Sequence, residues 1–200
     1  SSGLPHKLDD ESLQRGFALT GMQVAPSTIR VLMPDESVVI MPMEEYLRGV
    51  VPNEVYPNWP IDTLKAQAIA ARCYASAAVA NPRHADKGAD ICTTQHCQVW
   101  KPVYTDSTDR AISETRGVIA TYYGDVISAF YFSHCDSDGR THNSEDDFAE
   151  RVPYCRSVPC PCKGRESERP PIPGHMVGMC QWGAFYAAHD HGSSYSEILK

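Results

Sequence analysis

One alanine-rich stretch constrains the fold of this chain more than any other feature of its sequence. It begins near Asn58, a favourable N-cap residue, has Pro60 in its first turn and runs to Asn81. Its apolar residues recur at helical spacing, and one stripe consists of Leu64, Ala68, Ala71 and Ala75. Because small side chains allow another backbone to approach closely, we expect a long helix buried at the centre of the protein.

A shorter helix is predicted immediately upstream, from Pro42 to Pro52. Proline suits the first position of a helix, and the residues that follow at helical spacing are Tyr46, Leu47 and Val50. Pro52 should end this helix because proline cannot donate a backbone hydrogen bond.

Glu54 lies between the two predicted helices, in the segment VVPNEVYPNWP. Its apolar and aromatic neighbours favour the protonated form of a carboxyl group, and a rigid connection between helices would hold it in place. A general acid that works near neutral pH needs both properties. On these residues alone, a solvated loop glutamate is the alternative.

Strand-like segments flank the predicted helices. Residues 17–24, 28–33 and 37–41 alternate or are rich in β-formers, and 34–36 is a turn sequence. Residues 118–123 and 126–133 are strong strand runs, and Gly124-Asp125 between them suits a tight hairpin. Shorter helices are expected at 108–116 and 181–189, with Gly117 and Gly192 as stops and a Ser194–Glu197 capping box after the second.

Length and charge limit the architecture and the partners. Two hundred residues suit one domain, and we expect an α+β fold in which the central helix packs on mainly antiparallel strands. Residues 1–16 are polar and are expected to form a flexible arm before a domain at 17–200. The net charge of −7 argues against a nucleic-acid partner, and no apolar run is long enough to span a membrane. No signal peptide is evident, so a targeting or anchor segment would lie outside this chain.

Several segments resemble, in order, motifs of the SpoIID/LytB family of bacterial cell-wall proteins. They are LRGVVPNEVYPNWPIDTLKAQAIAARCYA, ADICTTQHCQVW, FYFSHCDSDGRTHNSEDDF, PYCRSV and GHMVGMCQWGAFYAAHDHG, and they cover most of residues 41–200. The resemblance implies a peptidoglycan lytic transglycosylase of the bacterial envelope or exterior, in a family with a link to sporulation, with Glu54 at the position of the catalytic glutamate. Many relatives carry a β-rich insertion where this chain has only residues 163–173, which implies a minimal domain.

The implied reaction needs one carboxyl group and no cofactor. Glu54 would protonate the oxygen between N-acetylmuramic acid and N-acetylglucosamine, then accept the proton of the sugar's own 6-hydroxyl as a 1,6-anhydro ring closes. A muramidase is one alternative, and its second carboxylate would be Glu45, Asp62 or Glu145. The other alternative is a non-catalytic cell-wall binding module that enhances a separate amidase.

The same resemblance implies a substrate groove between two loops, at 133–145 and 174–183. Glycines in GHMVGMCQWGA allow the backbone to approach a ligand closely, and the histidine and glutamine there offer hydrogen bonds. Peptidoglycan strands are the expected partner of this groove. The candidate contacts with the glycan are Arg72, Tyr74, Gln98, Ser133, Asn143, Glu145, His175 and Gln181.

Eight cysteines offer two further groups of side chains. His84, Cys92, His96 and Cys97 are a suitable set for a closed, structural zinc site, and a Cys92–Cys97 disulfide is the rival interpretation. In the C-terminal half, Cys160 or Cys162 would form a disulfide with Cys135 or Cys180. A second metal site that includes His134 or His175 is the alternative there, and Cys73 is expected to be a small buried residue.

Overall fold

The structure is a computed structural model of the chain, and it describes residues 16–20, 25–171 and 174–200. The arm predicted for residues 1–16, except for Gly16, therefore lies outside the described residues. The same holds for residues 21–24 of the first predicted strand and for residues 172–173 of the short loop.

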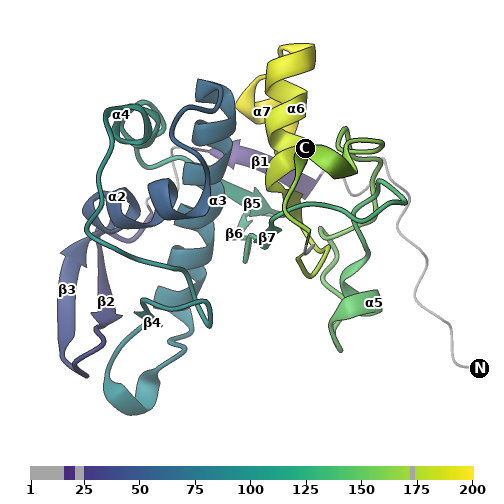
Figure 1. The fold of residues 1–200 in the computed structure, drawn as a ribbon. Coiled ribbons are helices and arrows are strands. Elements are labelled where there is room, and N and C mark those ends of the chain that lie inside the picture. Colours follow the sequence, from purple (N-terminus) through teal and green to yellow (C-terminus); the bar gives the residue numbers. More distant parts are fainter. Residues whose placement is uncertain (1–15, 21–24, 172–173) are drawn as a thin grey trace, which may run out of the picture.

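The helix predicted from the alanine-rich stretch is α3 (Ile61–Ala80), and it lies at the centre of the molecule (Figure 1). Helices α2 (Met43–Glu54), α4 (Asp106–Glu114) and α6 (Gln181–His191) pack around it. Both of its long faces are covered, and most of its side chains are buried. The prediction of a buried central helix is confirmed.

The start of α3 differs from the prediction. The helix begins at Ile61 and Pro60 is its N-cap, whereas the sequence favoured Asn58 for that position. The carbonyl of Pro60 accepts a hydrogen bond from the backbone N–H of Leu64 at 3.2 Å, which begins the helical ladder. Proline fits here because the N-cap residue contributes its carbonyl, not its N–H, to the helix.

The end of α2 also differs, and this changes the setting of Glu54. The sequence predicts an end at Pro52, but α2 continues to Glu54. The backbone N–H of Val55 donates to the carbonyl of Val51 at 3.2 Å, so the last turn closes without the N–H that Pro52 lacks. Glu54 therefore projects from a helix end and not from a loop.

In the described part of the chain, the strands form three small sheets with the orders β3–β2–β4, β1–β5–β6 and β7–β8. The β2–β3, β1–β5 and β5–β6 pairs are antiparallel, whereas β2–β4 and β7–β8 are parallel. The mainly antiparallel arrangement expected from the sequence is therefore present, and the fold class is α+β. The strand bounds are β1 (Phe17–Thr20), β2 (Thr28–Leu32), β3 (Val38–Pro42), β4 (Ile91–Cys92), β5 (Ile119–Tyr122), β6 (Asp125–Val126), β7 (Tyr131–Phe132) and β8 (Met179–Cys180).

The hairpin between β5 and β6 turns one residue earlier than predicted. Its central residues are Tyr123 and Gly124, with φ angles of 49° and 91°, instead of Gly124 and Asp125. Two positive φ angles are what a two-residue hairpin turn of type I′ requires. The strand predicted over 126–133 is also interrupted, because Tyr131 and Phe132 leave this sheet and pair with β8.

The remaining elements are short. They are α5 (Ser144–Asp147), α7 (Tyr195–Ile198) and two 3₁₀ turns, η1 (Ala85–Lys87) and η2 (Glu166–Glu168). Gly192 ends α6 in a left-handed conformation, and the Ser194–Glu197 capping box is present at α7, as predicted. Within the described ranges, the helices are too short or too polar to cross a bilayer.

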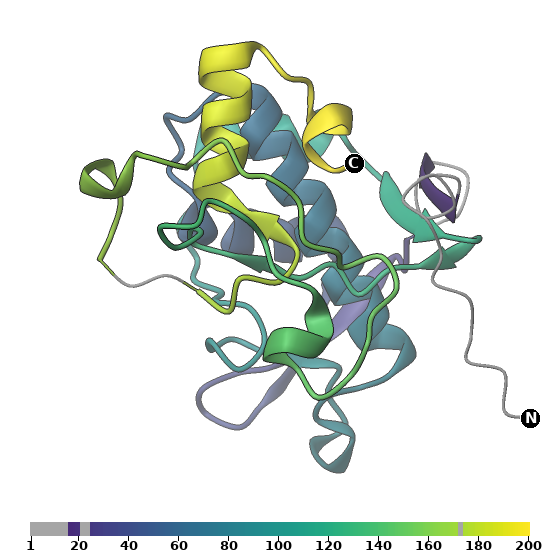
Figure 2. The same ribbon diagram turned by 90° about the vertical axis from the view of Figure 1, so that its right-hand side faces the viewer.

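The core has three parts. One lies between α2, α3 and β2, and a second lies between the other face of α3 and β5. The third is small, and it gathers cysteines from the loops after β7 together with the side chain of Tyr186 on α6. Figure 2 shows these loop segments crossing in front of α3 and beside α6.

Candidate active site

Glu54 is the last residue of α2, and its side chain is half-buried. Burial raises the pKa of its carboxyl group above the ordinary value for glutamate. The helix end acts in the same direction, because the C-terminus of a helix carries partial negative charge. Glu54 therefore keeps its proton to a higher pH than a solvated glutamate would.

Three hydrogen-bond donors hold the Glu54 carboxyl group in place. The backbone N–H of Val99 donates to Oε1 at 3.3 Å, and the side chains of Gln181 and Tyr131 also bond to the carboxylate. These donors favour the ionised form and partly oppose the effect of burial. The carboxyl group is thus oriented, its pKa is raised on balance, and its ionised form is stabilised by these donors once the proton has left.

Tyr131 is itself held by a buried chain of hydrogen bonds. Gln98 Nε2 donates to the Tyr131 hydroxyl at 2.9 Å, and Gln98 Oε1 accepts from the Tyr46 hydroxyl at 3.0 Å. Burial raises the pKa of Tyr131 well above its ordinary value, and the charge of Glu54 adds to this rise. The Tyr131 hydroxyl therefore remains a donor. Gln98, a predicted glycan contact, is 1% exposed and lies behind this hydroxyl.

A glycine on α2 allows Val99 to reach Glu54. The indole of Trp100 lies directly on Gly49, where an added Cβ would be 2.3 Å from its Nε1 atom. The carbonyl of Gly49 also accepts from the backbone N–H of Lys101 at 3.0 Å. These contacts hold residues 99–101 against α2 at Gly49. The N–H of Val99 can therefore reach the Glu54 carboxylate, at the C-terminal end of the same helix.

Gln181 reaches Glu54 from the first residue of α6. Its Nε2 atom also donates to Oε1 of Gln67 at 3.3 Å, on the central helix. Because a glutamine amide carries two hydrogens, one nitrogen serves both Gln67 and Glu54. The polar Gln67 that interrupts the alanine-rich stretch is thereby explained as an anchor for Gln181.

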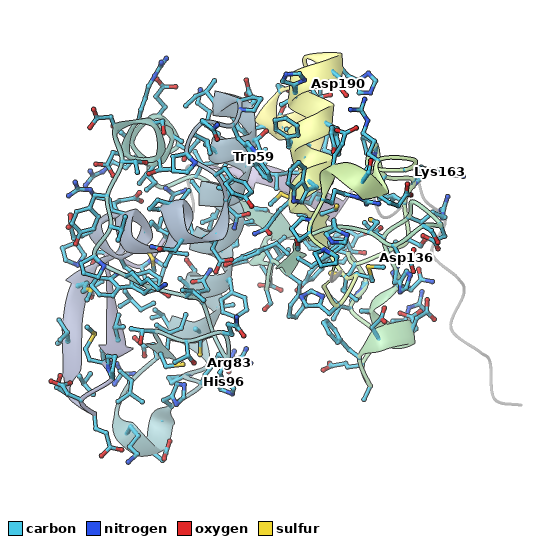
Figure 3. All side chains as sticks on the ribbon, viewed as in Figure 1. Trp59, Arg83, His96, Asp136, Lys163 and Asp190 are labelled. Carbon is cyan, nitrogen blue, oxygen red and sulfur yellow. The ribbon has the colours of Figure 1, made fainter. Side chains whose placement is uncertain are left out.

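Aromatic side chains from the segment after Glu54 and from the start of α6 gather into one cluster. The rings of Trp59 and Trp182 are 5.0 Å apart, and Tyr56 lies 5.2 Å from Trp59. Tyr56 is 53% exposed and lines an open depression with these two tryptophans. Figure 3 shows Trp59 between the central helix and α6. Flat aromatic faces that remain accessible suit contact with sugar rings.

Two predicted glycan contacts, Tyr74 and Ser133, have other neighbours in the structure. Tyr74 is half-buried with the guanidinium of Arg83 5.5 Å from its ring centre, and burial raises its pKa. The charge of Glu54 makes a smaller contribution to that rise, so Tyr74 faces the same region. The carbonyl of Ser133 accepts from the backbone N–H of Trp182 at 3.0 Å, which joins the loop after β7 to α6.

His175 lies in an aromatic setting next to β7. Its ring centre is 5.2 Å from that of Phe148, and its Nδ1 atom accepts from the backbone N–H of Val177 at 3.2 Å. Burial lowers its pKa, and a hydrogen bond with the Tyr131 backbone opposes that effect. His175 is thus next to the strand that carries Tyr131, and it has no described contact with Glu54 itself.

Asn143 is the N-cap of the short helix α5 and Glu145 lies in its first turn, and both side chains form hydrogen bonds or ion pairs there. Asn143 accepts from the backbone N–H of Ser157 at 3.1 Å and donates to Asp146 at 3.0 Å. Glu145 forms an ion pair with Arg156 at 2.5 Å, and this bond lowers its pKa to about 2. Both side chains therefore hold two parts of the loop after β7 together, residues 143–145 and residues 156–157.

Arg72 is fully buried and acts as a structural tie. Its guanidinium binds both carboxylate oxygens of Glu44, at 3.0 and 2.7 Å, and donates to the carbonyls of Val118 and Ile112. These bonds join α2, α3 and the start of β5. The geometry favours a role in holding the fold together over contact with a glycan.

The predicted zinc ligands come together below the central helix. The ligand atoms of His84, Cys92, His96 and Cys97 all lie within 4.8 Å of one another. Cys97 Sγ is 3.5 Å from both His84 Nε2 and His96 Nδ1. Figure 3 shows His96 at this end of the molecule, near Arg83. The set fits a tetrahedral zinc ion.

None of the eight cysteines forms a disulfide, so neither predicted pairing is observed. Cys73 is a small buried residue on α3, as expected. Four of the C-terminal cysteines instead approach one another as a group that contains neither His134 nor His175. The group differs from the alternative prediction of a metal site with His134 or His175, because it consists of cysteines alone.

Sequence reasoning missed Tyr131, Tyr46 and the Val99 N–H. Tyr131 could have been found, because it shares a strand face with Ser133, two residues later. Tyr46 appeared only as an apolar member of a helical stripe. The Val99 N–H depends on how the chain crosses α2, and no side-chain pattern encodes that crossing.

Comparison with known proteins adds an independent finding. The model of the family described as Stage II sporulation protein matches residues 35–122. An uncharacterized protein of Brachyspira hyodysenteriae (strain ATCC 49526 / WA1) is 36% identical over 150 residues, which are 72% of this chain and 40% of that protein.

Two proteins of Bacillus subtilis (strain 168) are also similar. Stage II sporulation protein D is 33% identical over 156 residues, 70% of this chain and 45% of its own length. The Amidase enhancer is 33% identical over 109 residues, 54% of this chain and 14% of its own length. The chain thus spans less than half the length of these relatives. The matched residues include Glu54 and the central helix, and the chain belongs to the SpoIID/LytB family.

Proposed function

We propose that this chain is a peptidoglycan lytic transglycosylase of the bacterial cell wall, acting in the envelope or outside the cell. The observation that carries the proposal is one half-buried carboxyl group, Glu54, with a raised pKa and three hydrogen-bond donors around it. Membership of the SpoIID/LytB family supports a role at the cell wall.

In the first step, protonated Glu54 gives its proton to the glycosidic oxygen between N-acetylmuramic acid and N-acetylglucosamine. The bond from this oxygen to the anomeric carbon breaks, and positive charge develops on the muramic acid ring. The Val99 N–H and the side chains of Tyr131 and Gln181 stabilise the carboxylate that remains. Acid–base assistance of this kind contributes roughly 10²–10⁴ in rate.

In the second step, the Glu54 carboxylate accepts the proton of the 6-hydroxyl of the same sugar. The freed oxygen bonds to the anomeric carbon and closes a 1,6-anhydro ring, and Glu54 ends the cycle protonated. Because the nucleophile belongs to the substrate, holding the sugar in position replaces activation of a water. The exposed ring of Tyr56, which lies 6.1 Å from that of Trp182, is suited to that positioning.

A muramidase would need a second carboxylate at about 5–10 Å from the first. Glu45 lies nine residues before Glu54 on one helix, which is about 13 Å along the axis. The carboxylates of Asp62, Glu145 and Glu45 each form a hydrogen bond or an ion pair with a group other than Glu54. Their partners are the Tyr195 N–H for Asp62, Arg156 for Glu145 and Arg48 for Glu45. These engagements favour a mechanism in which Glu54 acts alone.

We also propose that His84, Cys92, His96 and Cys97 hold one structural zinc ion. Four protein ligands leave no position for a substrate, so the ion would stabilise the fold and take no part in bond cleavage. It would fix the segment that leads to Val99, and through its N–H the orientation of Glu54. Catalysis itself requires no cofactor in this proposal.

The second candidate function is a non-catalytic wall-binding module that assists a separate amidase. The name of one relative, Amidase enhancer, is the observation that favours it. Such a module needs the aromatic surface around Tyr56 but not an acid, so it would tolerate replacement of Glu54. The two functions therefore differ in what Glu54→Gln changes.

The distinguishing experiment compares cleavage and binding of purified glycan strands, with and without stem peptides. The proposal predicts that Glu54→Gln binds the strands like wild type but releases no soluble fragments. Glu150→Gln, at an exposed loop glutamate, is the matched control and should cleave normally. Binding without cleavage by wild type would reject the enzyme and favour the binding module.

A further inference from the structure

A second group of metal-ligating side chains lies outside the Glu54 site. The sulfur atoms of Cys135, Cys160, Cys162 and Cys180 are all within 4.8 Å of one another, and all four side chains are buried. Those of Cys160 and Cys162 are 3.2 Å apart, and those of Cys162 and Cys180 are 3.9 Å apart. Four thiolates at about 2.3 Å from a tetrahedral zinc ion are about 3.8 Å apart. The spacing is close to that of a four-thiolate site.

Donors around the group point at the sulfur atoms. The backbone N–H of Gly183, in the first turn of α6, donates to Cys180 Sγ at 3.1 Å. The Arg169 side chain is 2% exposed, and its Nη1 donates to Cys162 Sγ at 3.1 Å while Nη2 lies 3.5 Å from Glu166. A helix N-terminus and a buried guanidinium stabilise thiolates, and thiolates are the form that binds metal.

The backbone is shaped to bring α6 onto the cysteines. A Cβ atom at Gly183 would lie 2.4 Å from Cys160 Sγ, so only glycine allows this approach. The four cysteines come from three places: the loop after β7, the loop at 160–162 and the end of β8. One ion bound to all of them would join three segments that are distant in the sequence.

The loops around the group have few other means of stabilisation. Within the described residues between β7 and β8, the regular elements are α5 and η2, of four and three residues. Besides the cysteines, the small core cluster here contains Phe132, Met176 and Tyr186, and Val177 is buried close by. Small regions with so little apolar core are commonly held by a metal ion or by disulfides, and no disulfide is present.

We propose that Cys135, Cys160, Cys162 and Cys180 bind one zinc ion in a closed, structural four-thiolate site. The site is distinct from the set at 84–97, and it does not depend on the transglycosylase activity. Asp136 and Lys163, which follow two of the cysteines, both lie in the loops to the right of α6 in Figure 3. The ion would tie this layer to α6.

The site also has a consequence for the proposed catalytic group. Cys180 is the N-cap of α6, and the next residue, Gln181, bonds to Glu54. A metal ion on Cys180 would fix the start of α6 and, through it, the position of Gln181. The proposed zinc would therefore help to orient Glu54 indirectly, through Cys180 and Gln181, without contact with the substrate.

The test measures zinc by mass spectrometry and its ligands by X-ray absorption on the full chain. With both sites filled, wild type carries two zinc ions per chain, with an average of three sulfur and one nitrogen ligand. Cys92→Ser/Cys97→Ser leaves the proposed site untouched, so it should keep one zinc with four sulfurs at about 2.3 Å. Cys162→Ser should lose one zinc. Cys155→Ser removes a buried cysteine outside both groups and should keep two.

The outcomes separate this site from the other zinc proposal. If the set at 84–97 holds no zinc, wild type still carries one ion, bound by four sulfurs. The inference is overturned if wild type holds a single zinc with two sulfur and two nitrogen ligands, or none. It is also overturned if intact mass shows the loss of two hydrogens for a disulfide among these cysteines.

Discussion

Replacing Tyr131 by phenylalanine should weaken Glu54 as an acid and shift the pH range of glycan cleavage. The Tyr131 hydroxyl bonds to the Glu54 carboxylate, and a hydrogen bond to a charged group contributes about 1.5–3 kcal/mol. Its loss destabilises the ionised form alone. Since about 1.4 kcal/mol is a tenfold change in an equilibrium constant, the acid dissociation constant of Glu54 should fall about tenfold or more.

The direction of the pH effect follows from the role of Glu54. It must carry its proton to act as an acid, so kcat/KM falls as the pH rises through its pKa. In Tyr131→Phe this alkaline limb should move to higher pH by about one pH unit. Turnover at the optimum should fall, because the carboxylate left after proton transfer has lost a donor. The assay is the release of soluble fragments from purified glycan strands across the pH range.

A matched control separates this effect from the loss of any buried tyrosine hydroxyl. The Tyr154 hydroxyl accepts from the backbone N–H of Ser128 at 3.0 Å, so Tyr154→Phe removes a hydrogen bond of another part of the fold. Its alkaline limb should coincide with that of wild type. A limb in Tyr131→Phe that stays in place, or moves to lower pH, would refute the proposed role of this hydroxyl.

Three other substitutions test local contacts. Glu54→Gln should raise the free energy of unfolding at neutral pH and leave it unchanged at acid pH. The reason is that the folded wild type holds the Glu54 proton more tightly than the unfolded chain, so it loses stability as the pH rises between the two pKa values. Urea titrations at both pH values measure this, and a difference that does not depend on pH contradicts it. Arg72→Met should cost about 3 kcal/mol or more in urea unfolding because it leaves Glu44 unpaired, and an unchanged stability contradicts the structural role. Gly49→Ala should cost about 1–3 kcal/mol by thermal unfolding because its Cβ meets the Trp100 indole, and a neutral result would show that the indole can move freely.

The helical scaffold could be predicted from the sequence because its signals are local. The alanine stripe identified α3, and the left-handed glycine at 192 and the capping box at 194–197 marked two helix ends. The errors were also local in origin. By residue type, Pro52 and Asn58 predict helix boundaries, whereas the hydrogen bonds that close each turn let α2 extend to Glu54 and α3 start at Ile61.

The surroundings of Glu54 could be predicted only in part, because its donors come from distant segments. Gln181 was identified through its motif, but the Val99 N–H lies 45 residues from Glu54 and depends on the packing of Trp100 on α2. A backbone donor has no signature in the sequence. The use of Tyr131 as a donor depends on β7 leaving one sheet to pair with β8, which its strand pattern does not reveal.

The cysteines show a related limit. Their types and number indicated covalent or metal links, and the set at 84–97 was identified because its members are close in the sequence. The four C-terminal cysteines are brought together by the β7–β8 pairing and by the start of α6. Long-range pairing of this kind decides which cysteines meet, and spacing along the chain does not encode it.

The chemical identity of the sugar ends tests the central claim most directly. Purified glycan strands are digested with wild type and with Glu54→Gln, and the fragments are identified by mass spectrometry. The account predicts 1,6-anhydro-N-acetylmuramic acid ends from wild type and no new ends from Glu54→Gln. Reducing N-acetylmuramic acid ends from wild type would contradict it, because they would mean that water is the nucleophile and that a second group activates it.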